Sequence, residues 1–84
     1  MSDLQDLPNI GDVLAGRLKA AGIANAEALL KLGDAIAFAK IRAGLPDDAC
    51  THTRLALAGA VHGVRWHSLD KPLREKLTAE AKHT

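Results

Sequence analysis

Residues 7–23 read LPNIGDVLAGRLKAAGI, and this stretch combines a turn signal with a helix signal. A proline precedes Asn9-Ile10-Gly11, which is typical of a tight turn. After the turn, Ile10, Leu14, Leu18 and Ala21 recur at steps of four and three residues, which places them on one face of a helix over residues 12–21. A turn followed by a basic helix can hold a DNA backbone, and it can equally be an ordinary corner between two helices.

Four more helices are predicted after this one, over residues 26–32, 34–43, 49–62 and from 71 onward. Asn25 is placed to cap the first of these, and Asp70 the last. Residues 45–48 form a predicted turn, in which Asp47 or Asp48 caps the helix that follows. Four glycines are expected at helix ends or turns, because glycine adopts the left-handed conformation without penalty: Gly22, Gly33, Gly44 and Gly63.

The helix over residues 49–62 is expected at the centre of the fold. Its small residues Ala56, Gly59 and Ala60 allow another backbone to approach closely. Gly16 is expected to mark a second close approach, because glycine inside a helix costs about 1 kcal/mol relative to alanine. The predicted inner face of the central helix consists of Cys50, Thr53, Leu57, Ala60 and Val61.

Composition supports a compact, all-α, five-helix domain covering residues 1–84. The chain is 48% hydrophobic, mainly alanine and leucine, with one Phe, one Trp and no Tyr. Its formal net charge of +1 provides no overall positive field for nucleic acid. A single cysteine, the absence of a signal peptide and the lack of a long apolar run predict a soluble cytoplasmic protein with no membrane contact.

The sequence resembles the C-terminal domain of the TfoX/Sxy regulators of DNA-uptake competence in bacteria. The resemblance covers nearly the whole chain, and its most specific parts are LxNIG and ALxGAxxGxRW. The matching positions are Leu7, Asn9-Ile10-Gly11, Leu18, Gly22-Ile23, Leu29, Leu32-Gly33, Ile41-Arg42, Cys50, Ala56-Leu57, Gly59-Ala60, Gly63, Arg65-Trp66 and Leu69.

This resemblance implies an all-α domain with an N-terminal half related to helix-hairpin-helix (SAM-like) proteins, and a regulatory connection to competence. It implies no catalytic activity. In the fuller regulators another domain precedes this one, and the 84 residues contain no counterpart to it.

A helix-hairpin-helix contact would use the N–H groups of Gly11, Asp12 and Val13 to hold a phosphate, assisted by Arg17 or Lys19. The candidate DNA-binding residues are therefore Asn9, Ile10, Gly11, Asp12, Val13, Arg17 and Lys19. Against this contact, the Asp12 carboxylate stands where the phosphate would lie, and the preceding helix is reduced to one turn within residues 2–6. The alternative is a purely structural turn, with Leu7 and Ile10 anchored in the core.

Other candidate sites have weaker signals. Cys50 and His52 point apart on a helix and His62 lies about 15 Å further along, so no metal or other cofactor is expected. Cys50 near a helix N-terminus is a candidate for a lowered pKa, although a small buried residue is the favoured interpretation. Arg65, Trp66 and His67 form a candidate interaction surface, in which Trp66 either closes the core or provides a stacking platform.

These observations predict a non-catalytic regulatory or interaction module whose partner is a protein, acting as a monomer or weak homodimer. Weak, sequence-independent DNA-backbone binding through the turn is the alternative. The last helix carries an apolar stripe of Leu69, Leu73, Leu77 and Ala81 beneath a mainly basic exposed face. That basic excess is suited to an acidic partner.

Overall fold

A computed structural model describes residues 2–44 and 50–82 of the chain. These residues form five α-helices and two short 3₁₀ turns and contain no strand, so the predicted all-α fold is confirmed. The elements in chain order are η1 (Leu4–Asp6), α1 (Asp12–Ala20), α2 (Ala26–Leu32), α3 (Asp34–Gly44), α4 (Thr51–His62), η3 (Trp66–Ser68) and α5 (Lys71–Lys82). Each described helix is too short or too polar to span a lipid bilayer.

Local sequence signals set most helix ends. The Asn25 side chain accepts a hydrogen bond of 2.9 Å from the N–H of Ala28, as predicted for an N-cap. Gly33 and Gly63 end α2 and α4 with φ values of 88° and 74°, which only glycine adopts readily. Gly44 instead is the last residue of α3. The predicted turn at 45–48, with its Asp47 or Asp48 cap, lies outside the described residues.

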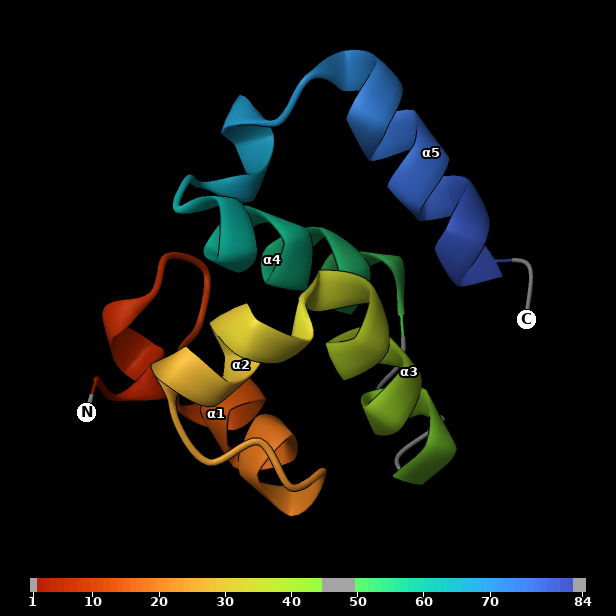
Figure 1. Cartoon of the computed structure of the whole chain (residues 1–84). Helices are drawn as coiled ribbons and strands as arrows, with labels where there is room; N and C mark the ends of the chain where they lie inside the picture. Colours follow the sequence, from red (N-terminus) through yellow and green to blue (C-terminus); the bar gives the residue numbers. More distant parts are fainter. Residues whose placement is uncertain (1, 45–49, 83–84) are drawn as a thin grey trace.

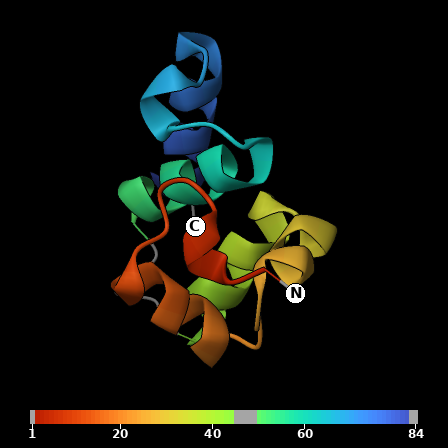
Figure 2. The same ribbon diagram turned by 90° about the vertical axis from the view of Figure 1, so that its left-hand side faces the viewer.

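Helix α4 lies between two groups of elements, as predicted for the central helix. In Figures 1 and 2, η1 and α1–α3 occupy one side of α4, while η3 and α5 occupy the other. The larger core cluster includes Leu4, Ile10, Leu18, Leu29, Phe38, Ile41 and Leu57. The smaller one consists of Leu55, Ala58, Leu69 and Leu77, with Trp66 and Leu73 packed against it.

A buried arginine joins three helices. Arg54 on α4 is only 4% exposed, and its guanidinium contacts Asp34 of α3 at 2.5 Å and Glu80 of α5 at 3.2 Å. The same guanidinium lies 5.9 Å from the centre of the Phe38 ring. Because an unpaired buried charge is strongly destabilising, these carboxylates are required where they stand.

Two predictions about packing were wrong. A Cβ added at Gly16 would meet nothing within 4 Å, because α1 turns this position to solvent. Cys50 is exposed and occupies the N-cap of α4, whose first buried residue is Thr53. Ala49, the predicted first helical residue, lies outside the described residues.

The predicted close approach at Gly59 is confirmed. An added Cβ would lie 2.4 Å from the Asn9 side-chain nitrogen, 2.8 Å from the Val64 carbonyl oxygen and 3.2 Å from the Trp66 Cα. Two of these atoms are backbone and cannot move aside cheaply. The chain after α4 therefore folds back against a bare stretch of helix backbone.

We predict that Gly59→Ala destabilises the protein by about 2 kcal/mol or more, because the methyl group has no space. Gly16→Ala is the matched control and should stabilise by about 1 kcal/mol, since it adds helix propensity at an open position. Urea unfolding followed by circular dichroism measures both changes. Equal stability of Gly59→Ala and wild type would contradict the close approach.

Candidate functional site

The turn before α1 is held by the side chain of Asn9. Asn9 has a φ of 70°, a left-handed conformation that asparagine tolerates better than most residues. Its amide nitrogen donates to the carbonyl oxygen of Val64 at 2.9 Å and of Ala56 at 3.5 Å, and its amide oxygen accepts from the N–H of Trp66 at 3.1 Å. The Asn9 side chain is therefore used inside the fold.

The apolar residues of the same turn serve the core. Ile10 is 6% exposed, and half-buried Leu7 packs against the larger core cluster. Both residues have the positions expected of core anchors. The side chain of Ile10, a candidate DNA-binding residue, is thus buried in the core.

The start of α1 lies on the surface. Gly11 at the N-cap has no side chain to cap the helix, and Val13 is 66% exposed. The side-chain nitrogen of Gln5 donates a hydrogen bond to the carboxylate of Asp12. A carboxylate thus stands at the helix N-terminus, where it interacts favourably with the helix dipole and would repel a phosphate.

A hollow of about 370 Å³ lies beside this helix start. Its lining combines the first turns of α1 and α4, and consists of Asn9, Gly11, Asp12, Val13, Leu14, Arg17, Cys50, His52, Thr53 and Ala56. Of the two basic candidates, Arg17 lines this hollow and Lys19 does not. Asp12 is the carboxylate among the lining residues.

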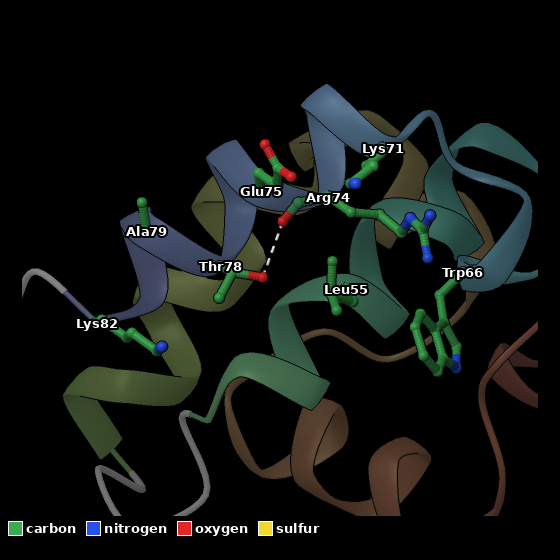
Figure 3. Close-up of a pocket in the computed structure, with 8 residues that line it drawn as sticks. All are labelled: Leu55, Trp66, Lys71, Arg74, Glu75, Thr78, Ala79 and Lys82. Carbon is green, nitrogen blue, oxygen red and sulfur yellow. Dashed lines mark hydrogen bonds between the residues drawn. The ribbon is translucent and has the colours of Figure 1, made fainter.

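A second and larger hollow lies between α4, η3 and α5, and it is called the α4–α5 groove below. It has a volume of about 570 Å³ and is lined by Leu55, Trp66, Lys71, Arg74, Glu75, Thr78, Ala79 and Lys82 (Figure 3). Figure 3 shows the Arg74 side chain extending from α5 toward Trp66, with Lys82 near the opposite end. The Thr78 hydroxyl donates to the Arg74 carbonyl at 2.8 Å.

The Arg65–His67 segment reaches this groove through its tryptophan. Trp66 is half-buried against the smaller core cluster, and its remaining surface lines the groove. The His67 ring stacks on Trp66 with centroids 4.2 Å apart, and the His52 ring meets it edge-on at 5.2 Å. Arg65 and His67 are exposed beside the groove without lining it.

The sequence indicated a solvated basic face on the last helix, suited to an acidic partner, but it did not predict a groove there. A signal was nevertheless present. The α5 residues of the groove have the three- and four-residue spacing of one helix face: Lys71, Arg74, Glu75, Thr78, Ala79 and Lys82. What the spacing could not show is that this face lies next to Leu55 and Trp66.

The cysteine and histidine candidates do not converge. Among the described residues, no three His, Cys, Asp or Glu side chains are grouped as a metal site would require. The Cys50 sulfur lies 3.4 Å from the Thr53 hydroxyl oxygen. The hydrogen bond with that hydroxyl lowers the pKa of the Cys50 thiol, and partial burial opposes this effect.

Comparison with known proteins places these features in a family. The family model described as TfoX C-terminal domain matches residues 1–81. A curated relative, DNA transformation protein TfoX1 of Aliivibrio fischeri, is 31% identical over 74 residues, which make up 88% of this chain and 35% of the relative. The chain thus spans about a third of the length of that relative.

Two solved structures from Listeria monocytogenes are also similar. The crystal structure of an uncharacterized protein, in a triclinic form, has a TM-score of 0.89 and 37% identity, covering 96% of this chain and 91% of that one. That of a protein of unknown function, in a tetragonal form, has a TM-score of 0.87 and 38% identity, covering 95% and 96%.

We predict that Cys50 is alkylated at a lower pH than an ordinary cysteine, because the thiolate is the nucleophile and its lowered pKa maintains it further into the acidic range. Thr53→Val removes the hydroxyl and should shift the pH midpoint of the iodoacetamide reaction upward, whereas Thr53→Ser should retain it. Identical midpoints for wild type and Thr53→Val would rule out the hydroxyl as the cause. Circular dichroism verifies that each variant is folded.

Proposed function

Because the chain belongs to the TfoX C-terminal domain family, we propose that it is a non-catalytic interaction module that acts in the regulation of DNA uptake. The match over residues 1–81 is the observation that carries this proposal. The name of the Aliivibrio relative, DNA transformation protein TfoX1, supports the connection with transformation.

The shape of the molecule supports interaction as the mode of action. The α4–α5 groove offers an apolar floor and several exposed charged side chains. The hollow beside the start of α1 is lined by a thiol, an imidazole and a carboxylate, from Cys50, His52 and Asp12. The His52 ring packs edge-on against Trp66, which favours a structural role for it.

A second candidate function is weak DNA-backbone binding through the start of α1. The favouring observation is that Gly11 leaves the helix N-terminus without a side-chain cap, while Arg17 lines the same hollow. Backbone N–H groups at a helix N-terminus attract phosphate. The carboxylate of Asp12 opposes such binding, so any affinity of the native chain for DNA should be low.

We predict that the tagged chain, expressed in its native host, retains a stoichiometric protein partner after nuclease treatment of the lysate. A protein contact does not depend on nucleic acid, so the recovered band should be equally strong with and without nuclease. Quantitative mass spectrometry of both samples makes the comparison. Loss of every co-purified protein after nuclease would overturn the interaction proposal in favour of nucleic-acid binding.

For DNA binding, Asp12→Asn should raise the affinity for duplex DNA several-fold at low salt, because it removes the charge that repels phosphate. Ala39→Lys on the exposed face of α3 changes the net charge equally and is the matched control. Fluorescence anisotropy at several salt concentrations gives the binding constant at each. The logarithm of that constant should fall against the logarithm of salt concentration with a slope of roughly −0.9 per phosphate contacted. Equal effects of the two variants would exclude a local site at the turn.

A further inference from the structure

We propose that the α4–α5 groove binds an acidic, leucine-rich amphipathic segment of a protein partner. Arg74 holds a carboxylate of that segment, and its apolar side chains lie against Leu55 and Trp66. This inference rests on the proposed interaction function and adds the place of contact and the chemistry of the partner.

The shape of the groove suits a peptide segment. Its floor is apolar, with Leu55 7% exposed and Trp66 half-buried. The residues along its α5 edge include exposed Lys71, Glu75, Ala79 and Lys82, so the groove is open to solvent along the helix. A hollow of about 570 Å³ with an apolar floor and an open edge can receive side chains from a helix lying along α5.

The charges of the groove favour an acidic occupant. Lys71, Arg74 and Lys82 line it, against the single carboxylate of Glu75. The other acidic residue on this part of α5, Glu80, is already paired with Arg54 across the helix interface. The three basic side chains therefore outnumber the one carboxylate of the groove, and complementary charge on a partner improves association.

Arg74 provides the most specific feature. It is only half-buried, and its guanidinium extends along the groove toward Trp66 (Figure 3). The planar guanidinium presents donors in a fork that matches a carboxylate, so its terminal nitrogens can hold a glutamate or aspartate of the partner.

A peptide is favoured over nucleic acid by the surroundings of Trp66. One face of the indole is already stacked against His67, and the His52 ring meets it edge-on, which restricts base stacking. Glu75 would repel a run of phosphates. A peptide with a few spaced carboxylates can avoid Glu75 while placing apolar side chains on the floor.

The test uses Trp66 as the reporter, since the chain has one Trp and no Tyr. The probe is a capped peptide of about three helical turns, with leucine at three- and four-residue spacing and glutamate at the flanking positions. We expect a saturable change in Trp66 emission. The same peptide with glutamine in place of glutamate should bind about ten-fold more weakly.

Variants of the groove locate the contact. Arg74→Gln should weaken binding of the glutamate peptide about ten-fold, and Lys82→Gln should weaken it less. Lys76→Gln is the matched control, because Lys76 is exposed on α5 and does not line the groove. Lys82 is exposed, so Lys82→Gln keeps the test valid even if Arg74→Gln alters the fold.

Several outcomes would overturn the inference. One is equal affinity of wild type for the glutamate and glutamine peptides. Another is peptide affinity that is unchanged in both Arg74→Gln and Lys82→Gln. The third is tighter binding of single-stranded oligothymidylate than of the peptide at the same site.

The nuclease-treated co-purification distinguishes failure of the groove from failure of the interaction function. If wild type and both variants retain a partner equally, the interaction function is supported and the groove is excluded as the binding site. If wild type retains no partner, the interaction function is excluded, and the peptide titration alone decides whether the groove binds.

Discussion

The Asn9 side chain makes the connection on which both candidate surfaces depend. It bonds the first turn of the chain to the carbonyl oxygen of Val64 and the N–H of Trp66, which lie more than fifty residues later. This contact is sterically available because Gly59 presents no Cβ to the Asn9 amide. The start of α1 and the position of Trp66 are thus set by one polar side chain and one missing methyl group.

The groove depends on a second, electrostatic constraint. Helix α5 buries Leu77 against α4, and Glu80 of α5 pairs with the buried Arg54 of α4 across the same interface. Asp34 shares the same guanidinium, so α3 and α5 are positioned by opposite sides of one charge. Because a lone buried guanidinium is costly, the three helices are stabilised in one arrangement, and that arrangement leaves Arg74 and Trp66 on the same hollow.

The two hollows have different electrostatic character. The one at the start of α1 contains the Asp12 carboxylate at a helix N-terminus, a combination that is internally satisfied and unfavourable to anions. The α4–α5 groove combines an apolar floor with a mainly cationic edge formed by Lys71, Arg74 and Lys82. The charge of the groove therefore suits an acidic partner, whereas the start of α1 is less suited to a DNA backbone.

The sequence by itself determined the helices, the family and the central place of α4, because these follow from local periodicity, caps and an ordered set of residues along the chain. It also indicated the close approach at Gly59, although it could not name Asn9 as the neighbour. The tertiary structure alone decided that Gly16 faces solvent, that Cys50 is exposed, that Arg54 is buried between two carboxylates, and that one face of α5 borders Trp66. These properties depend on which helix faces meet across long sequence separations, and spacing within one helix carries no information about the face opposite.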